Sequence, residues 1–347
     1  MRGILLWRIS GTVLAILMLL LLAAGGVCAY LNSPSPGIPA GGSLFRVLKG
    51  ESVSQVAQRL KQEKLIRSAF LLKLLSRFSG SESLFKRGFF TIKPGESTIE
   101  IHNLLISGYQ EEVRLTFPEG WTLGRIAEHL EKRGVAPKRE VLEAARSKTL
   151  LAEFGIPGSS LEGYLFPDTY FFPPNYPAQV ALEQMVKNFF DHLERILPDY
   201  RGLDRRELHE KIIVASIVER EYRLDPEAPL IASVFYNRLK RNIGLESCAT
   251  LEYIITEIQA KPHPQFIAQE DKSINSPYNT YKWAGLPPGP ISNPGEVALR
   301  AAFHPAKTDY WYFLLKDPLT GEHYFSQDLR EHNEAKSHYL KQVGAGG

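Results

Sequence analysis

The first hydrophobic pattern in the chain is an unbroken apolar run near the N-terminus. Residues 9–31 form a stretch of 23 positions without a charged side chain. At about 1.5 Å per residue, a helix of this length spans roughly 34 Å, which is enough to cross the hydrocarbon core of a bilayer. A soluble surface helix would carry a polar stripe, and this run has none. The pattern therefore predicts a transmembrane helix over residues 9–31.

The charges on either side of this run indicate how it lies in the membrane. Arg2 and Arg8 precede it, and no charged residue occurs from Asn32 to Phe45. Because positively charged flanks stay in the cytoplasm, residues 1–8 are predicted to be a cytoplasmic tail. The rest is then periplasmic or extracytoplasmic, in a single-pass protein of the cell (inner) membrane. A cleaved signal peptide is the alternative, although its apolar region usually has only about 7–15 residues.

A pattern of strand, turn and capped helix recurs three times after a linker. Residues 32–43 contain three prolines and three glycines in twelve positions, which predicts a linker without regular structure. Alternating stretches follow at residues 44–48, 89–93 and 113–117. Each leads through a glycine to a helix expected to begin after Ser52, Ser97 or Thr122, which are residue types that cap helix N-termini. The repeats predict compact α+β units.

The first two repeats resemble LysM-type modules, which bind glycans containing N-acetylglucosamine. Gln55 and Glu100 lie three positions after their caps, as a capping box requires. The resemblance predicts a LysM-like α+β domain over residues 44–110 and implies that it binds glycan, with a purely structural role as the alternative. The third repeat predicts a connecting α+β segment over residues 111–160.

An unusual helix pattern lies at residues 207–222. The segment has no Gly or Pro, and its apolar side chains are spread around nearly the whole helix, which is typical of a buried helix. Glu219 and Glu221 nevertheless fall among these apolar positions. Burial of a carboxyl group is costly unless it is paired or protonated, and burial raises its pKa. A carboxyl group with a pKa near neutral suits general acid catalysis on a glycosidic oxygen.

An ion pair is the alternative role for these two carboxylates. Arg220, Arg223 and Arg238 are candidates to neutralise either of them, and such pairs are common structural features. Helical geometry does not separate Glu219 from Glu221. The choice between a catalytic acid and a structural ion pair stays open on the residues alone.

Aromatic and polar loops on both sides of this helix suit the recognition of sugars. Residues 161–170 combine aromatic rings with Glu162, and Asn279 and Tyr281 precede a rigid Pro- and Gly-rich loop at 285–291. Rings stack on the apolar faces of sugars, while carboxylates, amides and hydroxyls bond to sugar hydroxyl and acetamido groups. Packing of the loops on a core is the alternative for most of the aromatic rings.

Composition argues against several other classes of protein. The formal net charge is +3, and the N-terminal tail supplies two of these charges, so the chain lacks the concentrated positive charge of a nucleic-acid-binding protein. Cys28 lies in the apolar run, far in the sequence from Cys248, which predicts no disulfide. No Cys/His cluster has the spacing of metal ligands, so no metal or cofactor is expected. A thiol nucleophile at Cys248, with His263 or His304, is a weaker alternative.

Six short motifs follow one another after residue 160. They are LEGYLFPDTY at 161–170, ASIVERE at 215–221, SVFYNRL at 233–239, SPYNTY at 276–281, GLPPGPI at 285–291 and HPAK at 304–307. In this order they resemble the motifs of the endolytic murein transglycosylase family (MltG or YceG-like). The resemblance covers about residues 44–340. It implies a transglycosylase catalytic domain at residues 161–340, as a larger mixed α/β part with a buried catalytic helix in an α+β protein.

The resemblance also implies roles for individual residues. By it, the first carboxylate of ASIVERE, Glu219, is the catalytic residue. Substrate contacts are predicted for Glu162, Asn237, Glu246, Ser247, Asn279 and Tyr281. Many members of the family carry Gln and Asp-Pro where this chain has Glu246-Ser247-Cys248-Ala249. This departure leaves two roles open for Glu246, because it could raise the pKa of Glu219 or bind a substrate hydroxyl.

The resemblance implies that the chain is a peptidoglycan lytic transglycosylase, a lyase acting on a polysaccharide. By the resemblance, Glu219 protonates the oxygen of the MurNAc–GlcNAc bond and then takes a proton from the muramoyl C6 hydroxyl, which closes into a 1,6-anhydro end. The family implies endolytic cleavage of nascent glycan strands, termination of their elongation and contact with penicillin-binding synthases. The alternatives are a hydrolase (muramidase) with Glu162 or Glu246 as a second carboxylate, and a noncatalytic membrane-anchored scaffold that binds glycan.

Overall fold

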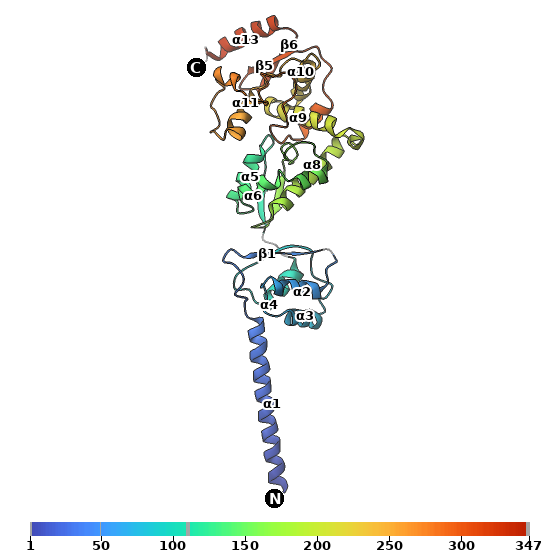
Figure 1. The fold of residues 1–347 in the computed structure, drawn as a ribbon, viewed down its shortest axis with the longest axis vertical. Coiled ribbons are helices and arrows are strands. Elements are labelled where there is room, and N and C mark those ends of the chain that lie inside the picture. The colour runs from blue at the N-terminus through green and yellow to red at the C-terminus, as the bar shows by residue number, and fades with distance from the viewer. Residues whose placement is uncertain (1, 49, 109–111, 345–347) are drawn as a thin grey trace. The chain divides into compact units, whose positions relative to one another are not determined.

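A computed structural model of the chain describes residues 2–48, 50–108 and 112–344 (Figure 1). The described chain is mostly helical and contains small two-stranded sheets, which confirms the predicted α+β class. It separates into two compact units. Unit 1 comprises residues 1–113 with 173–175, and unit 2 comprises residues 114–172 with 176–347. The predicted domain boundary at 110/111 lies outside the described residues.

Helix α1 (Arg2–Asn32) is the predicted apolar helix. Its described stretch Leu14–Asn32 is long and apolar enough to cross a membrane, and none of this stretch is buried inside the protein. The helix continues without interruption through the predicted span into the first linker residue. Its length and composition fit a membrane anchor and a signal sequence alike.

Unit 1 builds a small domain from the first two sequence repeats. Its elements after α1 are β1 (Ser43–Val47), α2 (Val53–Gln62), α3 (Ala69–Phe78), β2 (Gly88–Ile92) and α4 (Thr98–Ser107). The two strands lie within one residue of the predicted stretches and pair antiparallel, with Phe45 opposite Phe90. Alternation along each strand sends these two rings to the same face, where the helices cover them.

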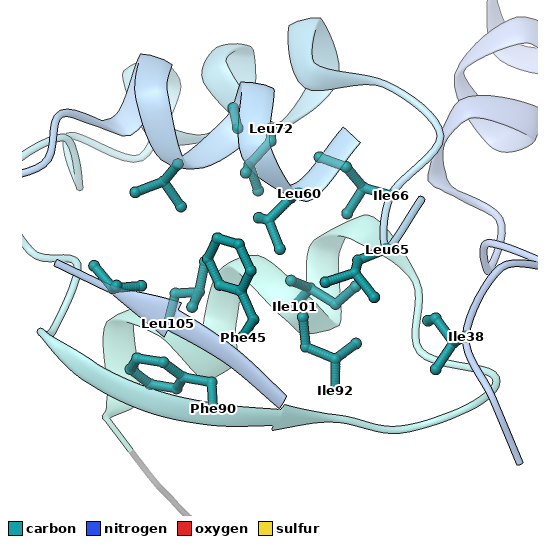
Figure 2. Close-up of a cluster of buried hydrophobic side chains, with 13 residues drawn as sticks. Ile38, Phe45, Leu60, Leu65, Ile66, Leu72, Phe90, Ile92, Ile101 and Leu105 are labelled. Carbon is teal, nitrogen blue, oxygen red and sulfur yellow. The ribbon is translucent and has the colours of Figure 1, made fainter. Parts of the chain in front are cut away.

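The core of unit 1 lies between this sheet and its three helices (Figure 2). Phe45, Leu60, Phe90 and Ile101 are completely buried there, and each comes from a different element. In the sequence repeats, Leu60 and Ile101 belong to the apolar positions of the helices that follow the caps Ser52 and Ser97. Such positions are expected to face the core. Each strand and each capped helix of the two repeats thus contributes a completely buried apolar side chain to this core.

The helix caps in both repeats form as predicted. Ser52 accepts a hydrogen bond from the backbone N–H of Gln55, whose side chain accepts one from Ser52 N–H, completing a capping box. Ser97 and Glu100 form the second box at the start of α4. A short polar side chain at each N-terminus therefore satisfies backbone donors that the helix itself leaves unpaired.

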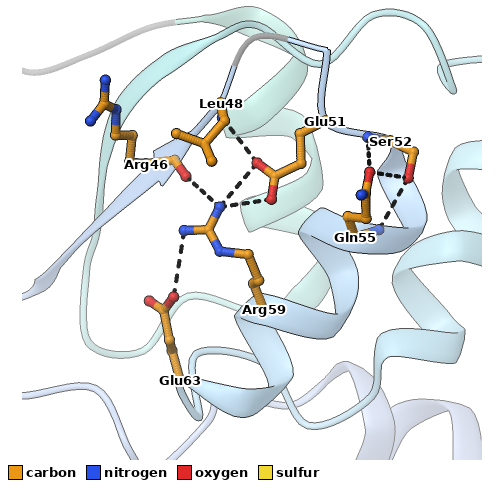
Figure 3. A network of polar contacts seen from close by, with 7 residues as sticks. All are labelled: Arg46, Leu48, Glu51, Ser52, Gln55, Arg59 and Glu63. Atoms are coloured by element: carbon orange, nitrogen blue, oxygen red, sulfur yellow. Dashed lines mark hydrogen bonds and ion pairs between the residues drawn. The ribbon is translucent and has the colours of Figure 1, made fainter.

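A network around Arg59 joins α2 to the end of β1 (Figure 3). The Arg59 guanidinium donates to both oxygens of Glu51, at 2.7 and 3.0 Å, and to the backbone oxygen of Arg46 at 3.0 Å. It also lies over the Phe45 ring, 4.7 Å from the centroid, and pairs with Glu63. This Arg therefore fixes the turn between the first strand and its helix.

Unit 2 is larger and contains the third repeat. Its elements are β3 (Val113–Thr116), α5 (Leu123–Lys132), α6 (Lys138–Ala144), α7 (Lys148–Phe154), β4 (Thr169–Phe172), α8 (Ala178–Ile196), η1 (Tyr200–Gly202), α9 (Arg205–Glu221), η2 (Asp225–Glu227), α10 (Ala228–Lys240), α11 (Cys248–Tyr253), η3 (Ile254–Ile258), η4 (Glu270–Ser273), α12 (Glu296–Phe303), β5 (Tyr312–Asp317), β6 (Glu322–Ser326) and α13 (Leu329–Gly344). Thr122 caps α5, as predicted, but β3 pairs with β4 rather than with the strands of unit 1.

Helix α9 lies at the centre of unit 2 and packs against α10, α11 and α12. All seven residues from Ile212 to Val218 are buried, which confirms the prediction of a helix buried all round. A hairpin is also present, since β5 and β6 pair antiparallel across a turn closed by Gly321 N–H and Asp317 O at 2.8 Å. The helix and the hairpin provide the framework of the candidate site.

We predict that Leu60→Ala destabilises unit 1 by about 2–5 kcal/mol, because it leaves a cavity in a completely buried core. Hydrogen exchange measured by mass spectrometry on the full chain would show faster exchange in peptides of α2, α4 and β2. Gln62→Ala is the matched control, since Gln62 is exposed on the same helix. Equal protection in the two variants would contradict the assigned core.

Candidate functional site

Two carboxylates end helix α9 at the edge of the buried core. Glu219 and Glu221 follow the buried run 212–218 directly and are themselves only half buried. Each residue turns the helix by about 100°, so two side chains that are two positions apart point in directions that differ by roughly 200°. The two carboxyl groups therefore lie on different sides of the helix. Each carboxyl group therefore has its own surroundings.

Glu219 lies against two glycines. Its Oε2 accepts the backbone N–H of Gly295 at 2.9 Å. A Cβ on Gly120 would lie 3.5 Å from Glu219 Cγ, and one on Gly295 would lie 1.9 Å from Glu119 Oε1. The Glu119 and Glu219 carboxyl groups thus approach the same glycine. The pKa of Glu219 is raised to about 8, mainly by burial and also by the charge of the nearby Glu119, while the Gly295 hydrogen bond opposes the rise.

Glu221 faces a different environment. The Ser247 hydroxyl donates a short hydrogen bond to its Oε1. Burial raises the pKa of Glu221 to about 7, while the Ser247 bond and the charges of Arg220 and Arg223 oppose the rise. Glu252 acts in the same direction as burial. Glu221 is therefore poised to exchange a proton near neutral pH.

Glu221 lines a cavity of about 640 Å³. Helix α9 contributes Arg220 and Glu221 to this cavity, whereas Glu219 is absent from the described residues that line it. The remaining lining residues are Arg223, Val234, Phe235, Arg238, Leu245, Glu246, Ser247, Cys248, Lys272, Tyr281, Trp311, Tyr312, Phe313, Leu314, Leu315, Pro318, His323, His332, Lys336 and Tyr339. The volume lies within the usual range for ligand sites, and aromatic and polar side chains alternate around it.

Three of the six predicted substrate contacts line this cavity with Glu221. They are Glu246, Ser247 and Tyr281. Ser247 donates to Glu221, and the Tyr281 hydroxyl lies 3.1 Å from the Cys248 sulfur. Glu246 adopts a left-handed backbone conformation with φ 54°, which directs the chain around the cavity rim. The segment 246–248 that departs from the family pattern is therefore part of the cavity wall.

The other three predicted contacts bond to the protein itself. Glu162 is buried and accepts the Leu123 N–H at 2.9 and 3.0 Å, and burial raises its pKa to about 8. The Asn237 amide donates to the backbone oxygens of Thr308 and Tyr310. Asn279 donates to two backbone oxygens and accepts the Tyr281 N–H. These three side chains position loops, and a direct contact with substrate stays a prediction for them.

Two of the three arginines that the sequence offered as partners, Arg220 and Arg238, have carboxylate partners of their own. Arg220 Nη2 lies 2.7 Å from Glu252 Oε2. Arg238 Nη2 lies 2.9 Å from Glu246 Oε1 and donates through its other nitrogens to two backbone oxygens. Among the described residues, no ion pair joins an arginine to Glu219 or Glu221. The ion-pair alternative that the sequence left open is therefore not the arrangement found.

Asn293 is a positioning residue that the sequence patterns did not single out. Its Oδ1 accepts the N–H groups of Gly163 and Leu165, both at 2.9 Å. Its Nδ2 donates to Trp121 O at 2.9 Å and to Glu162 Oε1 at 3.0 Å. One buried amide thus joins three separate segments. The hint in the sequence is an Asn in a loop that is rich in Pro and Gly.

Ser216 ties α9 to the same loop. Its hydroxyl accepts the Ile291 N–H at 3.0 Å, and its backbone oxygen accepts the Ser292 hydroxyl at 2.9 Å. The Pro- and Gly-rich loop is thereby held along α9, the helix that carries the two candidate acids.

Within the described residues, no group of three His, Cys, Asp or Glu side chains is arranged to hold a metal ion.

Known proteins resemble most of this chain. A family model described as the YceG-like family matches residues 45–338. The endolytic murein transglycosylase of Bacillus subtilis (strain 168) is 33% identical over 314 residues, covering 85% of this chain and 84% of that protein. The endolytic murein transglycosylase of Streptococcus pneumoniae serotype 2 (strain D39 / NCTC 7466) is 28% identical over 352 residues, covering 92% of this chain and 63% of that protein. A crystal structure of a YceG-like protein from Listeria monocytogenes is 29% identical, with a TM-score of 0.56 over 85% of this chain and 99% of that chain.

We predict that Asn293→Ala loosens the loops around α9, at a cost on the order of 3 kcal/mol, because it leaves buried N–H and C=O groups without partners. Hydrogen exchange at the amides of Gly163 and Leu165 should accelerate strongly. Asn275→Ala is the control, since Asn275 is exposed and bonds only to Lys282 among the interactions described. Unchanged protection at the two amides would show that Asn293 is not their anchor.

Proposed function

This chain belongs to the YceG-like family, and on that premise we propose that it is an endolytic peptidoglycan lytic transglycosylase. Its substrate is the glycan strand of nascent peptidoglycan, cut at the MurNAc–GlcNAc bond. The product carries a 1,6-anhydro-MurNAc end, and the cut ends elongation of the strand. Support at the family level comes from relatives named endolytic murein transglycosylase that match most of the chain.

The observation that carries the proposal is the position of Glu221. Its carboxyl group has a pKa of about 7 and lies on the wall of a cavity of about 640 Å³. A group with this pKa is present both as acid and as base near neutral pH, which the reaction requires of one residue. Aromatic rings such as Tyr281 and Trp311 line the same cavity and offer faces on which sugar rings can stack.

In this mechanism Glu221 serves twice. In its neutral form it donates its proton to the oxygen that joins the muramoyl C1 to the next sugar, and the C1–O bond breaks. The resulting carboxylate then takes the proton from the muramoyl C6 hydroxyl, whose oxygen bonds to C1. The nucleophile belongs to the substrate, so its effective concentration is high and no water is consumed. The Ser247 hydroxyl, which donates to Glu221, orients the carboxyl group.

Glu219 is the alternative acid, and the family resemblance of the ASIVERE motif names it first. Its pKa is also raised, to about 8, and it is half buried. The cavity that Glu221 lines with Glu246, Ser247 and Tyr281 favours Glu221, whereas the family resemblance favours Glu219. Glu219 instead contacts Gly295 and lies near Glu119.

A hydrolase is the second candidate function, because Glu246 lines the same cavity as Glu221. A glycosidase normally uses two carboxylates on either side of the bond. Against this role, Glu246 pairs with the buried Arg238 at 2.9 Å. Mass spectrometry of the products separates the two functions, since a hydrolytic product is heavier than the anhydro product by one water, about 18 Da.

The proposal includes a membrane location. Helix α1 is taken as an uncleaved anchor with the N-terminus in the cytoplasm, which would hold the enzyme where strands are made. Contact with penicillin-binding synthases, and glycan binding by the LysM-like domain, are further parts of the proposal that rest on the family resemblance alone.

We predict that Glu221→Gln lowers the rate of glycan cleavage by at least about 100-fold, since removal of a general acid typically costs 10²–10⁴. Glu219→Gln should keep most of the wild-type rate. The assay is release of anhydro-ended fragments from uncross-linked glycan strands, with hydrogen exchange confirming that both variants fold. The reverse ranking, with Glu219→Gln inactive and Glu221→Gln active, would return the catalytic role to Glu219.

The pH dependence offers an independent check. Since the acid must be protonated, kcat/KM should fall as pH rises through about 7, about tenfold per pH unit. Glu252→Gln should move this decline to lower pH, because Arg220 then acts on Glu221 without its partner. Glu119→Gln is the matched control, since it removes a charge that acts on Glu219. A decline that moves with Glu119→Gln and ignores Glu252→Gln would identify Glu219 as the acid.

A further inference from the structure

Helix α3 of unit 1 has apolar side chains on two opposite faces. Leu71, Leu72 and Ser76 are buried against the domain. The opposite face carries two large apolar side chains in the open, because Phe70 is 66% exposed and Phe78 is 84% exposed. Single exposed apolar residues are common, but two phenylalanines on one helix face form a patch that calls for a partner.

The residues of α3 that point away from the domain core, three exposed and two half buried, form one continuous stripe. Positions 70, 73, 74, 77 and 78 have the spacing of a single helix face, and they hold Phe, Lys, Leu, Arg and Phe. Leu74 is half buried and connects the two rings along the face. Among the described residues, no ion pair involves Lys73 or Arg77. The face is therefore both apolar and positively charged, which is the composition of a helix that lies in a membrane interface.

The stripe begins beside the end of the apolar helix α1. The Arg67 guanidinium, one turn before Phe70, lies over the Tyr30 ring at 4.9 Å and donates to the Tyr30 hydroxyl at 3.4 Å. Its Nε donates to Pro34 O at 3.1 Å. Helix α3 thus contacts the last turns of α1, as the two helices lie in Figure 1.

A second attachment fixes α1 to α4. The Asn32 side chain accepts the N–H of Ile99 at 3.0 Å, and Leu31 O accepts the Thr98 hydroxyl at 3.3 Å. Ile99 is itself exposed. Contacts to two helices hold the end of α1 in a defined direction, so the domain has a defined side toward any membrane that α1 crosses.

We propose that the stripe Phe70, Lys73, Leu74, Arg77 and Phe78 docks unit 1 onto the outer surface of the membrane that α1 spans. This inference rests on the membrane anchor included in the proposed function. The phenylalanine rings enter the boundary between headgroups and acyl chains. The two cations, on long flexible stems, reach the phosphates of anionic phospholipids. Tyr30, at the end of α1, marks the level of this interface.

The occupant is lipid rather than glycan because of the position and chemistry of the face. Its first residue lies one turn from a residue in contact with α1, so the membrane surface is the nearest extended partner. A glycan site would offer hydroxyl and amide partners, whereas every polar group on this stripe is a cation. Docking would add a contact with lipid to the contacts that already hold unit 1 beside the end of α1.

The test places a nitroxide label on the stripe in the full-length chain, reconstituted in nanodiscs of phosphatidylcholine and phosphatidylglycerol. In a Cys28→Ala, Cys248→Ser background, Phe78→Cys carries the label. Gln62→Cys, exposed on α2, is the aqueous reference. Leu20→Cys in α1 reports insertion of the anchor. Collision rates with oxygen and with a soluble nickel chelate give the depth of each label.

If the stripe docks, the ratio of the collision rate with oxygen to the collision rate with the nickel chelate should be several-fold higher for the label at 78 than for the label at 62. The double substitution Phe70→Glu with Lys73→Gln should return this ratio toward the aqueous value. Nanodiscs without phosphatidylglycerol should do so in part. A water-exposed label at 78 beside a membrane-buried label at 20 would overturn docking and leave the enzyme proposal intact. A water-exposed label at 20 would overturn both docking and the anchor.

Glycan is tested in the same sample. Soluble N-acetylglucosamine oligomers are added to the nanodiscs, and the label at 78 is measured again. If the label is exposed to both collision partners until glycan is added, and shielded from both afterwards, the face binds sugar and the membrane proposal is wrong. Depth that is unchanged by glycan supports docking on lipid.

Discussion

The chemistry proposed for this chain depends on the burial of the last turns of α9. Because residues 212–218 are buried on all sides, the backbone that carries Glu219 and Glu221 is held rigidly at the edge of the core. The same loss of solvent raises the pKa of both carboxyl groups. Burial alone therefore makes two candidate acids and does not choose between them. The choice comes from what lies on each side of the helix.

The two sides differ in what closes them. On the Glu219 side, two glycines and the Glu119 carboxyl group approach closely, and the loop that carries Gly295 is tied down through Asn293 and Ser216. On the Glu221 side, the hairpin β5–β6 and the loop before α11 stand away from the helix and leave a cavity. Buried polar networks of the first kind rigidify a structure, whereas a cavity beside a proton-exchanging group can admit a substrate.

The sequence predicted the elements well where local chemistry decides them. The caps at Ser52, Ser97 and Thr122 formed as expected, because a short side chain and the adjacent backbone suffice to make them. The buried helix was evident from its apolar periphery. The partner of the third repeat was not predictable, since β3 could pair with any exposed strand edge and pairs with β4, more than fifty residues later.

Some residues of the candidate cavity could be predicted from the sequence, but their arrangement could not. Glu246, Ser247 and Tyr281 were expected near substrate, and they do share one cavity. The sequence could not reveal that Glu221 lines this cavity. Glu219 and Glu221 are two positions apart on one helix and differ in the direction in which their side chains point. Which groups lie in each direction is known only from the packing of the helix. Asn279 and Asn237 show the converse, since residues that suit sugar recognition equally suit the support of loops.

Charge compensation bears on whether the proposed acid can keep its proton in a cavity lined by several cations. Arg220, Arg223, Arg238, Lys272 and Lys336 all line it, and an uncompensated cation close to Glu221 would lower the pKa of its carboxyl group and leave no proton to donate. Glu252 pairs with Arg220, and its charge raises the pKa of Glu221 while Arg220 lowers it. Glu246 forms an ion pair with Arg238, another cation of the lining. A Gln at position 246 would leave that buried guanidinium with only neutral acceptors. The carboxylate at this position therefore balances a local charge, which gives it a structural reason to be there that is independent of any contact with substrate.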